Sequence, residues 1–341
     1  MVLDNFKKII IHKNFNSTLH EIKKIDFALS LKPSELNIDL QKYTYPLNGN
    51  LVEAMEQDNK FVLNPKRGEE YFLDGHSLFA YDESILKFMG LEGSAYLTCH
   101  SLVYMDKSEY LPCSLITMYF YTKSKLISDQ LINIKYSDDP DMESKRDFIK
   151  DKLDFLVENV SENSILLIDG PLIGGDVYTY MIRAIDRFLE KNVIPLFFVK
   201  NSNSNLVVDN MGKLAGNYNS DLHWAYKFLN RGERTNFFAY ADRNNPDNAK
   251  IFCYIKGFNV SPQRVEMHRK TYAKYINIIP SLMDQIYYFL IAQGDQSNPQ
   301  VRPIAIAEKY ARASLKLINF DELIKGAGIN PTMNQERFAW S

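Results

Sequence analysis

The chain has 341 residues, enough for about two domains at the usual ~150 residues each, or for one large domain with additions. Hydrophobic residues make up 45% and charged residues 24%, which excludes a fully disordered chain, a collagen-like repeat and a disulfide scaffold. The 40 Lys and Arg against 42 Asp and Glu give a formal net charge of −2. A uniformly basic, nucleic-acid-binding coat is therefore excluded, and any site for a polyanion must be local.

The three cysteines, Cys99, Cys113 and Cys253, are widely spaced and form no C-x-x-C pair. This spacing predicts neither a zinc ribbon nor a thioredoxin-type redox site, and unpaired thiols favour a reducing compartment. The start of the chain, MVLDNFKKIIIHKNF, lacks the apolar core and cleavage site of a signal peptide. No run of about 18 apolar residues occurs that would span a membrane. We expect a cytoplasmic protein with no membrane partner.

Residues 1–60 are predicted to form a partly helical arm, because apolar residues recur at helical spacing before Pro33 and Pro46 interrupt the pattern. We expect this arm to pack on the rest of the chain or on a second subunit. Residues 61–325 are expected to form the main domain, and residues 326–341 a loosely held tail.

Three stretches have the composition of strands, and the gaps between them suit an antiparallel meander: 71–74, 94–105 and 111–122. A helix is predicted over 142–160, where apolar residues fall on one helical stripe. SILLID at 164–169 is a continuous apolar run, which is typical of a strand buried on both faces.

A second helix, capped by Asp176, and a second buried strand at 192–200 follow. The rest of the chain predicts a helix, three short strands and two further helices, at 221–230, 236–241, 250–256, 263–267, 279–293 and 303–318. Antiparallel strands followed by alternating helices and strands predict an α/β fold in which helices flank both faces of a mixed sheet.

Two acidic residues directly precede glycine at the end of an apolar run: Asp74 in YFLDGHS and Asp169 in ILLIDGPL. In sheets of this kind, sites gather at the carboxyl ends of strands, and glycine lets a ligand approach the backbone. Two neighbouring carboxylates either share a proton or hold divalent cations, and hard oxygen ligands select Mg²⁺ or Mn²⁺. The simpler interpretation is that each Asp-Gly pair closes a turn.

The helix predicted between these two motifs offers a third carboxylate, with Glu143, Asp147 and Asp151 as the candidates. The sequence does not decide between them, and an exposed, solvated helix face explains such residues equally well. Gly75-His76-Ser77-Leu78-Phe79 approaches the G-x-S-x-G nucleophile elbow, with Phe in place of the last glycine. A hydrolase that uses Ser77 is therefore a further alternative.

Basic residues near the ends of predicted strands are candidates for binding a polyanion: Lys200, Arg234 and Arg264. Tyr and Phe total 42 residues, enough to supply stacking surfaces for nucleic-acid bases, although most are expected in the core.

Six segments, in order along the chain, resemble the motifs of the NurA nucleases, the partners of the HerA hexameric ATPase in DNA end processing. They are FLDGHS (72–77), ILLIDGPL (165–172), VKNS (199–202), DLHWAYKFLNRGERT (221–235), QRVEM (263–267) and PIAIAEKYARAS (303–314). The resemblance implies an RNase H-like core over 61–325, to which the N-terminal arm and C-terminal helices are added. It also implies a homodimer, a HerA-like ATPase partner, Mn²⁺ or Mg²⁺ as cofactor, and 5′→3′ exonuclease and single-strand endonuclease activity on DNA ends.

By the same resemblance, Asp74 and Asp169 are the metal-binding carboxylates, and the family's helical acid falls on Asp147, Asp151 or Glu143. The family's terminal His or Asp falls on Glu308, which retains a metal-binding oxygen but has no imidazole. Lys200, Arg234 and Arg264 are expected to contact DNA. The departure at the terminal motif leaves an alternative from another class, a non-catalytic DNA-binding or scaffold subunit on the same fold.

Overall fold

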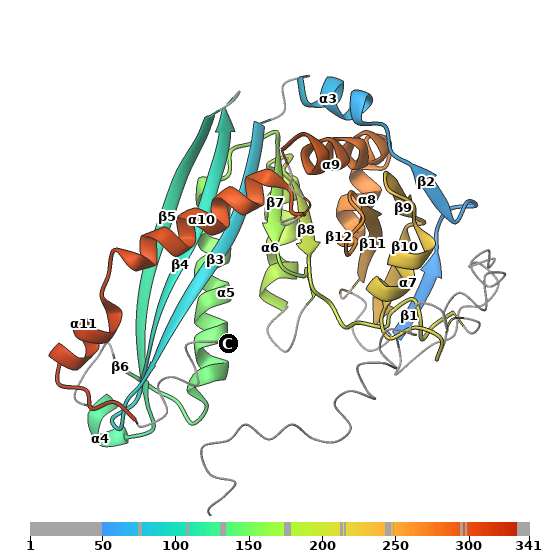
Figure 1. Ribbon diagram of the computed structural model, residues 1–341. Helices are drawn as coiled ribbons and strands as arrows, with labels where there is room; N and C mark the ends of the chain where they lie inside the picture. The colour runs from blue at the N-terminus through green and yellow to red at the C-terminus, as the bar shows by residue number, and fades with distance from the viewer. Residues whose placement is uncertain are drawn as a thin grey trace, which may run out of the picture. The chain divides into compact units, whose positions relative to one another are not determined.

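The computed structural model describes residues 50–73, 77–106, 109–129, 134–173, 179–211, 214, 216–242, 247, 249–293, 296 and 299–332 (Figure 1). All of them belong to one compact unit, Leu40–Ser341. Most of the arm predicted over 1–60 and most of the tail predicted over 326–341 lie outside them, so both stay predictions. Within the described part of the chain, no helix is long and apolar enough to cross a membrane.

The centre of the unit is a twelve-stranded sheet of described residues, with the order β1-β10-β11-β12-β8-β7-β3-β4-β5-β6, to which β9 and β2 add beside β11. The strands are β1 (Asn50–Ala54), β2 (Lys60–Val62), β3 (Ser77–Met89), β4 (Ser94–Asp106), β5 (Glu109–Thr122), β6 (Ile134–Tyr136), β7 (Ser164–Asp169), β8 (Ile194–Val199), β9 (Glu233–Thr235), β10 (Phe238–Asp242), β11 (Ala249–Lys256) and β12 (Gln263–His268). The pairs β3–β7, β7–β8 and β5–β6 are parallel and the others are antiparallel. The sheet is therefore mixed, as predicted.

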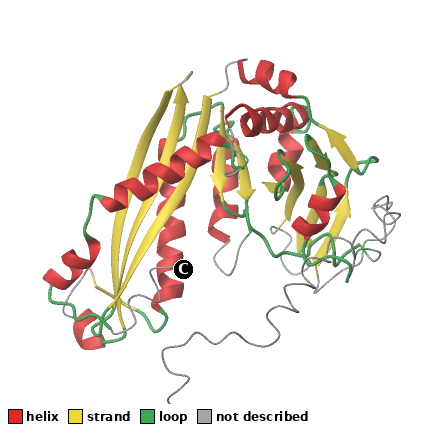
Figure 2. Ribbon diagram, in the orientation of Figure 1, coloured by secondary structure: helices red, strands yellow, loops and turns green. Residues whose placement is uncertain are grey.

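Helices cover both faces of this sheet (Figure 2). They are α3 (Pro65–Leu73), α4 (Lys125–Ser128), α5 (Pro140–Asn159), α6 (Thr179–Glu190), α7 (Asp221–Phe228), α8 (Arg269–Tyr275), α9 (Ile279–Gln293), α10 (Arg302–Lys316) and α11 (Phe320–Gly326). One core joins α5 and α6 to one face of β3, β7 and β8. A second core joins α9 and the start of α10 to the opposite face, and a third packs α10 and α11 on β3 and β4.

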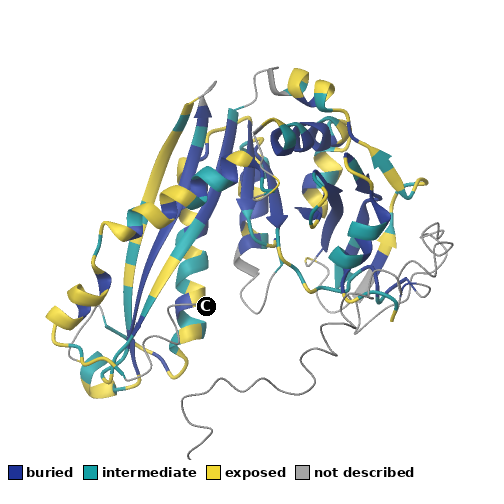
Figure 3. Ribbon diagram, in the orientation of Figure 1, coloured by how far each residue is buried: buried dark blue, intermediate teal, exposed yellow. Residues whose placement is uncertain are grey.

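The elements nearest the centre follow from their sequences. Five of the six residues of SILLID, from Ser164 to Ile168, are buried in β7, as expected for a strand covered by helices on both faces (Figure 3). The predicted helix over 142–160 is α5, which Asp139 caps by accepting a hydrogen bond from the Met142 amide at 3.1 Å. Antiparallel β4 and β5 confirm the strands predicted at 94–105 and 111–122.

The strand predicted at 71–74 is wrong, because residues 71–73 form the last turn of α3. Pro65 opens this helix, and Gly68 lies so close to the Asp284 backbone of α9 that a Cβ would clash there. Tyr71 then packs against the core under α9. The apolar run at 71–73 therefore belongs to a helix that docks on another helix, and the first long strand begins at Ser77.

Candidate active site

Two aspartates lie side by side at the point where strand β7 ends and its parallel neighbour β3 continues. Tyr81 of β3 is in register with Ile168 of β7, so the next residues along the two strands are Asp82 and Asp169. Strand β7 ends at Asp169, whereas β3 continues to Met89. The acid pair therefore lies at the carboxyl end of β7, the edge at which sites gather in such sheets.

Alternation along β3 decides which face Asp82 occupies. Phe79 and Tyr81 pack with α5 and α6, whereas Leu78 and Ala80 belong to the core formed with α9 and the start of α10. Asp82 therefore points to the face that α10 covers.

Lys200 and Glu308 complete a charged cluster with this pair. Lys200, directly after β8, places its Nζ 3.1 Å from Asp169 Oδ2, 3.8 Å from Asp82 Oδ2 and 3.6 Å from Glu308 Oε2. Glu308 lies on α10 and is held by Gln300, whose amide donates to Oε2 at 2.9 Å, and by Arg312 at 2.6 Å. Three carboxylates from β3, β7 and α10 thus converge on one ammonium group.

Burial makes the acid pair electrostatically unusual. The Asp82 side chain is 7% exposed, and burial together with the charge of Asp169 raises its pKa to about 8. Burial also raises the pKa of Asp169, against the opposing charge and hydrogen bond of Lys200. Asp82 Oδ1 accepts a hydrogen bond from the Glu83 amide at 2.7 Å, but its buried Oδ2 has no hydrogen-bond donor among the described residues. A buried carboxylate oxygen that accepts no hydrogen bond favours a cation beside it.

A second lysine, from α5, lies against the face of β3 opposite to Asp82. Lys152 of α5 donates to Glu83 Oε2 at 3.0 Å, and its Nζ lies 4.5 Å from the centroid of the Tyr81 ring. The Tyr81 hydroxyl and His100 Nδ1 are 2.6 Å apart, and burial lowers the pKa of His100 to about 3. This layer supports β3 from the side of α5.

The acids of α5 that were predicted to complete the metal site bind tyrosines of β5 instead. The Tyr121 hydroxyl donates to Asp147 Oδ2 at 2.5 Å, and the Tyr119 hydroxyl donates to Asp151 Oδ2 at 2.6 Å. Both carboxylates therefore hold α5 against the outer part of the sheet.

Strand register separates these acids from the aspartate pair. Tyr119 is aligned, through β4, with Lys87 of β3, which is five residues and about 17 Å beyond Asp82 along the strand. Helix α5 also covers the opposite face of β3 from Asp82. Glu143 forms an exposed ion pair with Arg146 at 3.1 Å. The structure does not bring any of the three predicted helical acids to Asp169.

Asp74 lies outside the described residues. Its predicted position at the carboxyl end of a strand depended on a strand at 71–74, and helix α3 takes that place. The described strand begins at Ser77, which is in register with Ser164, five residues before Asp169. Ser77 therefore opens a strand, whereas the serine of a nucleophile elbow is followed by a helix.

Arg264 is buried in an ion network rather than exposed. Its Nε lies 2.8 Å from Glu266 Oε1, which also accepts from Lys250 Nζ at 2.6 Å. Glu266 is fully buried, and although burial opposes it, the charges of Lys250 and Arg264 lower the pKa of this carboxyl. Its Oε2 accepts from the Leu172 amide at 3.0 Å.

This network fixes the two loops that leave the site. Leu172 lies three residues after Asp169, and the Arg264 guanidinium also donates to Ser202 Oγ at 3.1 Å and contacts Ser204 Oγ, shortly after Lys200. The motif QRVEM thus contributes a buried support under the acid pair and the lysine.

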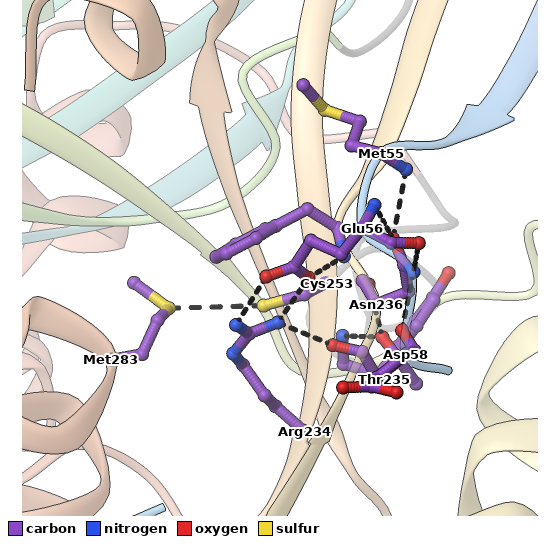
Figure 4. Close-up of polar contacts among 10 residues, drawn as sticks. Met55, Glu56, Asp58, Arg234, Thr235, Asn236, Cys253 and Met283 are labelled. Atoms are coloured by element: carbon purple, nitrogen blue, oxygen red, sulfur yellow. Dashed lines mark hydrogen bonds and ion pairs between the residues drawn. The ribbon is translucent and has the colours of Figure 1, made fainter. Parts of the chain in front are cut away.

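Arg234 is likewise internal (Figure 4). Its two terminal nitrogens donate to the carboxylate of Glu56 at 2.7 and 2.8 Å, and its guanidinium lies 4.1 and 4.3 Å from the ring centroids of Phe61 and Phe237. Asn236 binds the same loop through the backbone oxygens of Glu56 and Asp58, each at 2.7 Å. Both Arg234 and Arg264 are buried, so neither side chain lies at a surface that DNA could reach.

The described residues form a mixed sheet covered by helices on both faces, with an acid pair on neighbouring parallel strands, which is the arrangement expected of an RNase H-like fold. The NurA domain model matches residues 99–313, more than half of the chain, and the chain belongs to this family. Among curated proteins, none matches the chain significantly.

A solved structure at a TM-score above 0.5 supports this fold, and two further structures match at lower scores. The crystal structure of the NurA nuclease from Sulfolobus solfataricus is 13% identical and matches with a TM-score of 0.55, over 97% of this chain and 100% of that one. A crystal structure of NurA with manganese matches at 0.40, with 10% identity over 89% and 98% of the two chains. Ciona intestinalis endonuclease V in complex with DNA matches at 0.37, with 11% identity over 75% and 95%.

Proposed function

We propose that this NurA-family protein is a metal-dependent DNA nuclease whose reaction centre is the pair Asp82 and Asp169. The observation that supports this most is the buried Oδ2 of Asp82, which accepts no hydrogen bond from the described residues and lies beside Asp169 at the carboxyl end of β7. Family membership and the fold shared with a NurA nuclease supply the reaction class.

The residues at the site fit a divalent cation. Carboxylate oxygens are the ligands that Mg²⁺ and Mn²⁺ prefer, and Asp82, Asp169 and Glu308 each place one at 3.1 to 3.8 Å from the Lys200 ammonium. Among the described residues, no three His, Cys, Asp or Glu side chains are grouped closely enough to hold a metal ion together. We therefore assign Asp82 and Asp169 as the residues that hold the metal, and Glu308 as a further oxygen near them.

When bound, such a cation lowers the pKa of a water molecule and neutralises charge on the scissile phosphate. The chain's own residues provide the rest. Lys200 is positioned to contact a phosphate oxygen through its ammonium group, and Glu308, fixed by Gln300 and Arg312, orients that ammonium. The ion network around Glu266 keeps the loops after Asp169 and Lys200 in place.

The finer assignments follow from the family resemblance and are part of the proposal. They are 5′→3′ exonuclease and single-strand endonuclease activity on DNA ends, a homodimer, and cooperation with a HerA-type hexameric ATPase. In this assignment Asp82 takes the role expected of Asp74. The apolar run LFAY followed by Asp82 has the same pattern as SILLID.

One observation favours the second candidate, a non-catalytic DNA-binding or scaffold subunit. The Lys200 ammonium lies among the three carboxylates, and Lys152 adds a second positive charge behind β3. The negative charge of such a centre is already partly neutralised without a metal. This function predicts DNA binding without cleavage under any metal condition.

Cleavage of end-labelled single-stranded and blunt double-stranded DNA in Mn²⁺, Mg²⁺ and EDTA tests the proposal. Wild type is compared with Asp169→Asn and with Asp186→Asn, a matched change at an exposed carboxylate on α6 that pairs with Lys270. If the protein is a nuclease, wild type and Asp186→Asn cleave DNA in the presence of the metal, and Asp169→Asn does not. If wild type leaves both substrates intact in all three conditions, also with a HerA-type ATPase and ATP present, the non-catalytic subunit is the better account.

A further inference from the structure

Helix α10 presents a row of positive charges beside the acid pair. Its cations are Arg302, Lys309, Arg312 and Lys316, and all four are exposed. At about 100° per residue, they fall within about 80° of one another around the helix. One face of α10 is therefore a cationic stripe.

Little negative charge opposes this stripe. Glu308 is the one acidic residue of α10, and it pairs with Arg312 at 2.6 Å while that arginine stays 67% exposed. In the described part of the chain, no carboxylate lies within ion-pair distance of Arg302, Lys309 or Lys316. In a chain of net charge −2, this is a local concentration of unpaired cations.

The surface along the stripe is hollowed. An open groove of about 670 Å³ runs over α10, lined by these four cations together with small residues such as Ala305 and Ala313. The small side chains let a ligand approach the helix, while the long cationic ones flank it. The shape suits an extended polyanion rather than a compact apolar ligand.

The stripe passes the candidate active site near its middle, at Glu308. Glu308 lines the same groove and lies 3.6 Å from Lys200, which is 3.1 Å from Asp169. From there α10 crosses β3, β4 and β5 toward α11 (Figure 1). Arg302 and Lys316 are about 21 Å apart along the axis at 1.5 Å per residue, which matches about six nucleotides of one DNA strand.

We propose that the α10 groove is the binding site for the phosphate backbone of one DNA strand on its path to or from the acid pair. Lys309 and Lys316 contact phosphates as point charges, and Arg302 and Arg312 do so at the two sides of the groove. Binding is independent of sequence, because the groove offers charges to phosphates and few groups that read bases. That the ligand is DNA rests on the proposed function, whereas the binding site is inferred from the charges and the groove of α10.

The test measures binding of a labelled single strand of DNA in EDTA, where no metal-dependent cleavage can occur. The variant Lys309→Gln/Lys316→Gln is compared with Lys145→Gln/Lys150→Gln, which removes the same charge from exposed positions of α5. At about 0.7 counter-ions released per phosphate contact, the α10 variant binds about 25-fold more weakly at about 0.1 M salt, and its salt slope is shallower by about 1.4. The α5 variant binds like wild type.

Equal losses in the two variants, or an α10 variant with wild-type affinity and slope, would overturn the proposal. Because all four substitutions are at exposed positions, circular dichroism verifies that both variants keep the fold. Failure of the two proposals is distinguishable. A protein that cleaves DNA but binds it independently of Lys309 and Lys316 refutes the groove, whereas one that binds through them but never cleaves refutes the nuclease.

Discussion

The buried ion network offers the sharpest test of what holds the site together. Replacing Glu266 by Gln keeps the shape and an acceptor for the Leu172 amide, but leaves Lys250 and Arg264 without their shared negative charge. Lys250 and Arg264 are each 5% exposed in their side chains and Glu266 is fully buried, so solvent cannot compensate. Breaking a buried ion pair in this way costs about 3–5 kcal/mol of the free energy of unfolding.

Urea unfolding followed by circular dichroism measures this loss. The double variant Glu266→Gln/Lys250→Met removes one of the two cations that lost their negative partner. It should therefore be more stable than Glu266→Gln alone, with a coupling energy of at least about 1 kcal/mol. Asp186→Asn breaks an exposed pair with Lys270 and should cost less than about 1 kcal/mol. If Glu266→Gln costs no more than Asp186→Asn, the network does not support the loops after Asp169 and Lys200 as argued.

Three further predictions follow from the geometry around the site. Burial lowers the pKa of His100 to about 3, so the folded state keeps it neutral, while the unfolded chain takes up a proton below about pH 6.5. Wild type should therefore lose about 2 kcal/mol of stability from this residue between pH 8 and pH 5, and His100→Gln should lack that slope in urea titrations. Asp151→Ala removes the acceptor of Tyr119 and should lower stability by about 1–3 kcal/mol with cleavage unchanged, so a loss of cleavage in the folded variant would return Asp151 to the site. Lys200→Met leaves Asp82 and Asp169 without their cation, so Mn²⁺ should raise its melting temperature more than that of wild type; an equal or smaller rise would show that Lys200 and the metal do not share a site.

Much of the fold could be predicted from local patterns. SILLID at 164–169 has no polar interruption, so its burial in the middle of a sheet was recognisable from the sequence, and Asp169 was found with it. The alternating strands at 94–105 and 111–122 and the helix at 142–160 were recognisable for the same reason. These elements set the mixed sheet and one half of the acid pair.

Asp82, the other member of the acid pair, could not be identified from local sequence patterns. Asp82 follows the apolar run LFAY, but β3 continues through it to Met89, so no turn marks it as a strand end. Its pairing with Asp169 depends on parallel register between strands more than eighty residues apart. The Asp-Gly turn signal selected Asp74 instead, in a stretch that follows helix α3.

The predicted DNA-binding arginines show a similar limit. Arg234 and Arg264 stand in polar, charged motifs that are typical of a surface. Burial of Arg234 is possible because Glu56, remote in sequence, neutralises it. Burial of Arg264 is possible because Glu266, two residues further along the same strand, neutralises it. The exposed cations of α10 were not predicted as a binding site, because four basic residues on a helix near the end of the chain indicate no function by themselves. They become candidates once the structure places α10 beside the acid pair.

The central claim is that Asp82, paired with Asp169, is the reaction centre. The most direct measurement is cleavage of end-labelled DNA in Mn²⁺ by wild type, Asp82→Asn and Asp74→Asn, each verified as folded by circular dichroism. The account predicts that Asp82→Asn loses cleavage and that Asp74→Asn retains it. Cleavage at the wild-type rate by Asp82→Asn would contradict the account.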